Sequence, residues 1–281
     1  MFSGDAAGAR ELAAQSSVLA RRLGDDHLLA RALFLASWQA TNAASYEQAE
    51  ALATEALDLL RPLGETGEYA DVLFLLGALA LHRGEYQSAA DVFEDGLALN
   101  RRRGDERLLA RDLGGVASAL LNLGDLPQAR LLTEESLTLA RRHGDAWSTA
   151  MSLTLLGHIA LAEGHHARAG EVLAEAANLF RQIENPIYLP WCLEGLAGVA
   201  AARGQHERAA ELVGACEAVR RRPGMSVPLL HPAGHARTLA AIRGALPEDT
   251  LETALAAGES VPVEQPIAAV APWPVPPYRV P

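Results

Sequence analysis

Three polar side chains recur at intervals of forty residues and could recognise the backbone of a bound polypeptide. They are Asn42, His82 and Asn122. Asparagine offers both a donor and an acceptor, and neutral histidine offers one of each, so each side chain can pair with a peptide amide. A ladder of such groups at fixed spacing indicates a binding site for an extended ligand.

Aromatic and charged side chains accompany this ladder in the same stretches of sequence. Peptides and small ligands are commonly held by aromatic and apolar surface with a few oriented polar groups. The accompanying candidates are Arg31, Phe34 and Trp38, then Asp71 and Phe74, then Arg111, and further on His158, Trp191 and Glu194. The alternative is an ordinary solvated helix surface, and the sequence leaves both interpretations open.

The histidines and cysteines offer little coordination chemistry. His165, His166 and His206 have no carboxylate or cysteine at ligand spacing, so we expect exposed turn histidines and no metal site. Cys192 and Cys216 each lie twelve residues from position 204, so an antiparallel helical hairpin would bring them close. Packing is the favoured role for both, with a redox pair as the alternative.

No grouping of residues indicates catalysis. Neither a Ser/His/Asp arrangement, nor a carboxylate pair, nor a glycine-rich phosphate loop stands out. We therefore expect a protein that is not an enzyme and that needs no cofactor.

The elements that position the candidates follow from a forty-residue period. An alanine after a short polar turn recurs at 49, 89, 129, 169 and 209. A fixed period between 20 and 50 residues is typical of a stacked repeat array. Glycines at 24, 64, 104 and 144 end apolar stretches, and each period holds a pair of helices. Helix A of each pair is expected at 27–43, 67–83, 107–123, 147–163 and 187–203, and helix B follows it.

Small residues inside these expected helices indicate close helix crossings. Gly77 and Gly157 fall within helix A, where glycine costs about 1 kcal/mol relative to alanine. Such a cost is tolerated where a neighbouring helix must approach the backbone. A column of small residues in helix B has the same explanation: Ala56, Gly96, Ser136, Ala176 and Cys216.

One unit of the array resembles a tetratricopeptide repeat (TPR). Its signature residues are, in order, Leu73, Leu76, Gly77, Ala80, Gly84, Tyr86, Ala89, Phe93 and Gly96. The long period and the segments at 139–145, 211–220 and 254–258 are similar to the C-terminal TPR region of MalT-like regulators, ATPases of the bacterial LuxR family. The absence of lysine is typical of a GC-rich bacterial genome.

The resemblance implies an all-α superhelical solenoid of antiparallel helix pairs. It also implies that helix A lines the concave face, so that the candidates named above would form a groove. A protein or peptide partner in that groove, or an effector sensed there, would place the chain in a LuxR/MalT-like transcriptional regulatory system. The alternative is a receptor domain that binds a small-molecule inducer in the groove.

The period also defines the expected organisation of the chain. Residues 1–24 match a single helix B, 25–224 hold five TPR-like repeats, 225–260 form capping helices, and 261–281 are a proline-rich tail expected to be disordered. Helices are expected at 233–245 and 249–257 within the capping part. A lone helix B has an uncovered face, so the chain is either part of a longer protein or associates with another chain through residues 1–24.

Composition argues against several partners. The formal net charge of −11 opposes binding to nucleic acid or to an anionic membrane. No stretch approaches the roughly 20 apolar residues that a membrane helix needs, and the first residues lack a secretory pattern. Two cysteines are too few for a disulfide framework. We expect a cytoplasmic protein.

Overall fold

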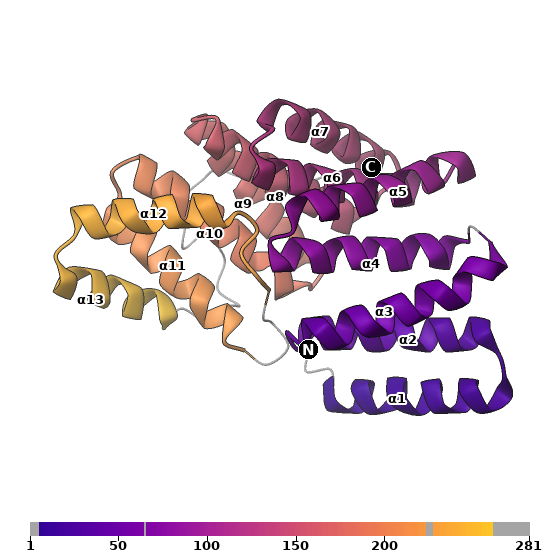
Figure 1. Ribbon diagram of the computed structural model, residues 1–281. Coiled ribbons are helices and arrows are strands. Elements are labelled where there is room, and N and C mark those ends of the chain that lie inside the picture. The colour runs from indigo at the N-terminus through magenta and orange to yellow at the C-terminus, as the bar shows by residue number, and fades with distance from the viewer. Residues whose placement is uncertain (1–5, 65, 223–226, 261–281) are drawn as a thin grey trace. The chain divides into compact units, whose positions relative to one another are not determined.

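A computed structural model describes residues 6–64, 66–222 and 227–260 of the chain. These residues form thirteen α-helices and two short 3₁₀ helices, with no strand among them (Figure 1). The all-α solenoid of consecutive helix pairs predicted from the period is confirmed. None of the described helices combines the length and the apolar character that a bilayer-spanning segment requires.

The chain divides into two compact units, and the boundary between them along the sequence falls within α6. The N-terminal unit (residues 1–119) and the C-terminal unit (residues 120–281) are described separately below. In chain order the first helices are α1 (Ala6–Leu23), α2 (Asp26–Asn42), α3 (Tyr46–Leu60), η1 (Arg61–Leu63), α4 (Gly67–Arg83), α5 (Tyr86–Arg103) and α6 (Glu106–Leu123). The remaining helices are α7 (Leu126–Arg142), α8 (Ala146–Ala162), α9 (His166–Gln182), η2 (Pro186–Tyr188), α10 (Leu189–Ala202), α11 (His206–Arg220), α12 (Pro232–Ala245) and α13 (Glu248–Glu259).

The helix boundaries follow the local signals in the sequence. The first four expected A helices agree with α2, α4, α6 and α8 to within one residue at each end, while the fifth begins as η2 and continues as α10. Asp25 and Asp145 cap α2 and α8 by accepting hydrogen bonds from backbone N–H groups three residues later. Gly84 and Gly104 end α4 and α5 in the left-handed conformation.

Phe93 fills the space between two A helices of the N-terminal unit. A Cβ atom added to Gly77 of α4 would lie 2.7 Å from the Phe93 ring, and one added to Gly115 of α6 would lie 2.6 Å from it. Real Cβ atoms do not approach carbon atoms so closely. The predicted close approach at Gly77 is therefore confirmed, and Phe93 is the side chain that requires it.

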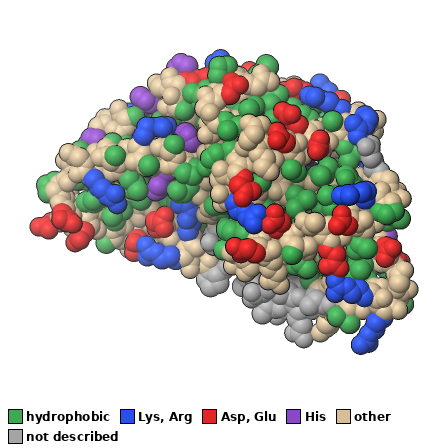
Figure 2. Space-filling model, in the orientation of Figure 1, with side chains coloured by type: hydrophobic (Ala, Val, Ile, Leu, Met, Phe, Trp, Pro, Cys, Tyr) green, Lys and Arg blue, Asp and Glu red, His purple; other side chains and the backbone are tan. Residues whose placement is uncertain are grey.

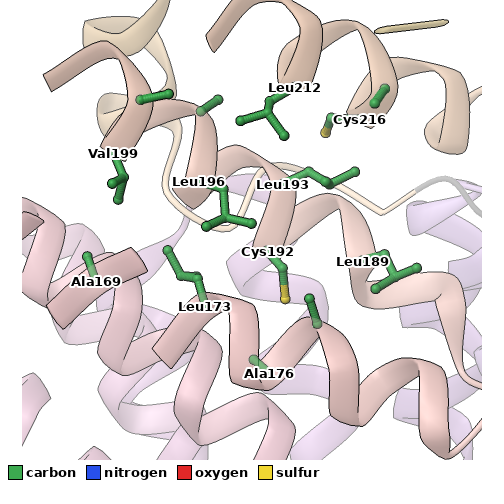
Figure 3. Packing of buried hydrophobic residues seen from close by; sticks show 14 of the residues in the cluster. Ala169, Leu173, Ala176, Leu189, Cys192, Leu193, Leu196, Val199, Leu212 and Cys216 are labelled. Carbon is green, nitrogen blue, oxygen red and sulfur yellow. The ribbon is translucent and has the colours of Figure 1, made fainter. Parts of the chain in front are cut away.

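Leu173 of α9 plays the same part in the C-terminal unit. A Cβ atom on Gly157 of α8 would lie 2.3 Å from Leu173, and one on Gly195 of α10 would lie 2.6 Å from it. Figure 3 shows Leu173 within the core that α9, α10 and α11 share, near Leu196 of α10. The prediction for Gly157 is confirmed by this contact.

The last two described helices pack on the end of the array, and Figure 1 shows them beside α10 and α11. α11 and α13 cross with their backbones in contact, because a Cβ atom on Gly214 would lie 2.1 Å from the Leu255 carbonyl oxygen. A Cβ atom on Gly258 would lie 1.9 Å from the Glu211 carbonyl oxygen. The domain boundaries expected from the sequence stay a prediction, and the first five residues of the expected lone helix B and the proline-rich tail at 261–281 lie outside the described residues.

Candidate functional site

In the N-terminal unit, three candidate residues line one pocket between α2 and α4. Arg31 and Phe34 of α2 meet Asp71 of α4 at a cavity of about 490 Å³. Glu68 and Arg103 add a carboxylate and a guanidinium to the same lining. The pocket therefore offers an aromatic surface with hydrogen-bonding groups of both charge signs.

Trp38 and Asn42 continue the surface of α2 beyond this pocket. The Trp38 ring stands edge-on to the Phe34 ring, with 6.4 Å between the ring centres. Both Trp38 and Asn42 are half-buried. One edge of α2 thus presents two aromatic rings and an amide along its length.

Asp71, Phe74 and Arg111 interact with one another on neighbouring A helices. The Arg111 Nη1 atom lies 2.5 Å from Asp71 Oδ1, and its guanidinium carbon lies 4.3 Å from the centre of the Phe74 ring. Arg111 also contacts the buried carboxylate of Asp112, and burial raises the pKa of that carboxyl group. These candidates form a preorganised polar network rather than separate contact points.

His82, at the end of α4, is uncharged at neutral pH. Burial lowers the pKa of its imidazole to about 4, and its ring packs against that of Tyr46 at 5.5 Å. Its Nδ1 atom is buried and has no hydrogen-bond partner within the described structure. The middle member of the polar ladder is thus a neutral ring whose Nδ1 atom is buried and not exposed to a ligand in this conformation.

In the C-terminal unit, the candidate residues lie beneath a stretch of the chain itself. We call residues 227–231, which precede α12 and have no regular secondary structure, the internal segment. Trp191 donates from Nε1 to the carbonyl oxygen of Pro228 at 2.7 Å, and Asn122 donates from Nδ2 to that of Leu230 at 3.0 Å. Arg220 donates from Nε to the carbonyl oxygen of Val227 at 2.9 Å. Side chains of the array therefore hold this segment by its backbone.

Apolar contacts complete the binding of the internal segment. Val227 and Leu230 are buried and form a cluster with Trp191. Met151 of α8 and Tyr188 of η2 pack against the same cluster. Trp191 thus serves as an apolar surface and as a hydrogen-bond donor to the same peptide.

Glu194 of α10 is buried below the internal segment and forms an ion pair with Arg220. Burial raises the pKa of its carboxyl group to about 7. The Arg220 guanidinium and a hydrogen bond donated by the backbone N–H of Leu230 act in the opposite direction and lower this pKa. His235 of α12 approaches the same carboxylate at 3.9 Å. The carboxylate therefore connects the array, the segment and α12.

His158 completes the layer below the segment. Burial lowers the pKa of its imidazole to about 4, so the ring is neutral, and its Nε2 lies 2.8 Å from the Trp191 carbonyl oxygen. Because a carbonyl oxygen only accepts, Nε2 carries the proton. His158 and Glu194 also line a small cavity of about 210 Å³ with His231, His235 and other residues, and Figure 2 shows histidines gathered over this α12 side of the C-terminal unit.

The two cysteines are buried free thiols. Cys192 lies on α10 and Cys216 on α11, in the core shown in Figure 3. Burial raises the pKa of the Cys192 thiol to about 12 and also raises that of Cys216, so both thiols stay protonated. Within the described ranges, no group of three or more His, Cys, Asp or Glu residues is placed to hold a metal ion.

Comparison with known proteins agrees with the repeat architecture. The family model for the MalT-like TPR region matches residues 30–259. The chain belongs to this family. A search of the curated proteins finds no match.

Solved structures resemble this MalT-like TPR region in fold. BtubC (BKLC) from P. vanneervenii is 20% identical with a TM-score of 0.57, and the match covers 86% of this chain and 94% of that one. A putative kinesin light chain with TPR-like repeats from Podosopora anserina is 18% identical with a TM-score of 0.48, covering 71% and 94%. At such identities the likeness to BtubC shows the fold alone.

Sequence reasoning missed the internal segment of this MalT-like TPR region. The run Val227-Pro228-Leu229-Leu230 is apolar and comes shortly after the last repeat. This apolar run is the one signal in the sequence that could have suggested a buried segment. Arg220 belongs to a run of arginines at the end of α11, and its contacts with Val227 and Glu194 could not be told from an ordinary helix end.

Proposed function

We propose that this TPR array is a non-catalytic scaffold that binds an extended segment of a partner protein on the A-helix surface of its N-terminal unit. We further propose that it does so within a LuxR/MalT-like regulatory system. The observation that supports the proposal is the internal segment. The corresponding surface of the C-terminal unit already holds a peptide of this kind.

The internal segment illustrates how such a surface binds polypeptide. Trp191 and Asn122 donate to its backbone carbonyls, which every peptide possesses, while Val227 and Leu230 enter an apolar cluster that depends on sequence. Backbone hydrogen bonds give such a site affinity, and side-chain pockets give it selectivity. The same division of roles is expected for a partner segment.

The pocket of the N-terminal unit has the groups that this mode of binding requires. Phe34 offers an aromatic anchor, Arg31 can donate to carbonyl oxygens, and Glu68 can accept from backbone N–H groups. Asp71 is held in place by Arg111, so the polar rim is ordered before a ligand binds. A preordered site loses less entropy on association.

Peptide display on the full chain, followed by binding measurements with purified peptides, tests this proposal. We expect selected peptides that lose at least tenfold in affinity, about 1.4 kcal/mol, on Phe34→Ala. Leu63→Ala is the matched control, because Leu63 is an exposed apolar residue of the same unit and lies outside the pocket lining. Selected peptides that bind both variants as tightly as the unchanged protein would refute the location.

A small-molecule effector is the second candidate function. The volume of about 490 Å³ falls within the roughly 300–1,000 Å³ that small-molecule pockets usually have. Thermal stabilisation by a metabolite that Phe34→Ala abolishes, with no peptide selected in the display experiment, would favour this candidate. The regulatory setting is tested separately by comparing transcript levels with and without the gene.

A further inference from the structure

The connection between α11 and α12 is longer than joining two neighbouring helices requires. It runs over eleven residues, 221–231, whereas two residues join α4 to α5 and two join α5 to α6. Helix–helix connections in bundles usually have roughly 2–8 residues. The additional length contains the internal segment, which lies on the A-helix surface of the C-terminal unit through its contacts with Asn122 of α6 and Trp191 of α10.

The backbone of the internal segment is paired with side chains of the array and not with other backbone groups. Within the described residues, positions 227–230 take part in no backbone–backbone hydrogen bond. Side chains of α6, α10 and α11 donate to the carbonyl oxygens of three of these four residues, and Glu194 accepts from the N–H group of Leu230. Turns usually pair their backbone groups with one another, whereas a bound extended peptide pairs them with its receptor.

The side chains of the segment are divided between anchors and exposed positions. Val227 and Leu230, three residues apart, are only 9% and 8% exposed and pack with Trp191. Pro228 and Leu229 between them are half-buried. Proline has no N–H group, and none is needed there, since Trp191 contacts only the carbonyl oxygen of Pro228. The surface therefore favours two aliphatic side chains at this spacing.

The end of the array is covered without the internal segment. The helix α12 packs on α10 and α11. The helix α13 packs on α11 with the backbones in contact at Gly214 and Gly258. Because these contacts involve helices alone, the internal segment can leave its surface while α12 and α13 remain in place.

We propose that the surface beneath the internal segment is a second peptide-binding site, which accepts an extended partner segment with two aliphatic side chains three residues apart. The internal segment competes with that partner from within the same chain. A partner can reproduce every contact, because any peptide has the backbone carbonyl groups and the two anchors are ordinary aliphatic side chains. The partner's apparent affinity falls with the fraction of molecules in which the surface is open. This proposal does not depend on the N-terminal pocket.

A peptide with the sequence of residues 227–232, blocked at both ends and carrying a fluorophore, tests the proposal by fluorescence anisotropy. The full chain with Val227→Ser and Leu230→Ser, which we call the opened variant, should bind this peptide at least tenfold more tightly than the unchanged chain does, because its own segment has lost both anchors. The same peptide with serine at both anchor positions is the matched control and should bind neither protein. Equal binding to both proteins, or no binding to an opened variant that circular dichroism shows to be folded, overturns the proposal.

A further substitution locates the bound peptide. Asn122→Ala in the opened variant should weaken peptide binding severalfold, since the donor to the Leu230 carbonyl oxygen is lost. An unchanged affinity would overturn the assignment to this surface. If Phe34→Ala abolishes binding instead, the peptide occupies the N-terminal pocket, which overturns this proposal and supports the one made for that pocket.

Hydrogen exchange of the unchanged chain gives a readout that needs no substitution. The Leu230 amide should exchange through a local opening that low concentrations of urea hardly accelerate. The amide of Leu196, in the core of α10, should exchange through a larger unfolding that urea accelerates strongly. The same urea dependence at both amides would show that the segment leaves only when the array unfolds, and would overturn the proposal.

Discussion

The two units use the same repeat positions in opposite ways. In the N-terminal unit, Phe34 and Arg31 line a cavity of about 490 Å³. In the C-terminal unit, Trp191 stands at the position of Arg31 four periods later, and it is only 8% exposed because the internal segment covers it. The same repeat position thus lines an open pocket in the N-terminal unit and is covered by the internal segment in the C-terminal unit.

Removing the indole of Trp191 should have the largest effect. Trp191→Ala eliminates the hydrogen bond to Pro228 and the apolar partner of Val227 and Leu230, so we expect a loss of about 3–5 kcal/mol in the free energy of unfolding. Urea unfolding measures it, and limited proteolysis should cut near the internal segment. Trp38→Ala changes a half-buried tryptophan of the N-terminal unit and should lower the free energy of unfolding by less than half as much. Equal losses for the two variants would contradict the difference between the two units.

Acid should weaken the C-terminal unit through His158. Its pKa is lowered to about 4, so between pH 6.5 and pH 4 the unfolded chain binds a proton that the folded chain does not. The stabilising contribution is complete above pH 6.5 and is lost as the pH falls through that window. Glu194, with a pKa raised to about 7, acts in the opposite sense, because its contribution is present at low pH and is lost as the pH rises from about 4.5 to 7.

A variant separates these two effects. His158→Gln keeps a donor for the Trp191 carbonyl but does not titrate. Between pH 7 and pH 5 the unchanged chain should lose about 2 kcal/mol more than His158→Gln, on the scale of 1.36 kcal/mol per pKa unit. Urea unfolding at both pH values measures this difference, and equal losses in the two proteins would exclude His158 as the acid-sensitive group.

The two asparagines of the polar ladder give a matched comparison. Asn122→Ala removes the donor to the Leu230 carbonyl oxygen and should cost about 1–2 kcal/mol, since a buried acceptor loses its partner. Asn42→Ala changes the same repeat position in the N-terminal unit, where no segment among the described residues is hydrogen-bonded to the side chain, and should cost under about 0.5 kcal/mol. Thermal unfolding of both variants is the measurement, and a larger loss for Asn42→Ala would contradict the assignment.

The smallest effect should be the same in both units. Ala44 and Glu184 adopt left-handed conformations, with φ of 56° and 51°, where related turns carry glycine. Ala44→Gly and Glu184→Gly should each stabilise the chain by about 0.5 kcal/mol, because relief of backbone strain exceeds the added entropy of glycine in the unfolded state. A destabilised variant in either unit would show that the turn is held by other contacts.

Local features of this molecule were predictable because they repeat. Gly84 and Gly164 have φ of 78° and 82°, as their place after each A helix requires. Arg31, Phe34 and Asp71, chosen for their place in the period, line one pocket. In both cases the structure at a residue is determined by its sequence neighbours or by a residue one repeat away.

The internal segment could not be predicted in the same way. Val227 to Leu230 have no counterpart in any repeat, and their partners Trp191 and Asn122 lie 37 and 108 residues away. Composition shows that such a run will be buried, but not against which surface. Only the folded array brings these partners to one place.

The glycines that face Phe93 and Leu173 on the following A helix occur in every second repeat. This alternation limits which A helix each B helix can pack against while the chain folds. Phe93 and Leu173 face glycine on the next A helix. In the other two repeats the small residues Ala53 and Thr133 stand at the position of Phe93, and Leu75 and Leu155 stand at the position of the glycine on the next A helix. These four residues are buried. A folding chain that skipped one repeat would set Phe93 against Leu155, which has no room for it. Skipping two repeats would set Phe93 against Gly195, which again leaves room for the ring. The alternation therefore disfavours mispairing between a B helix and the A helix one repeat too far along the chain.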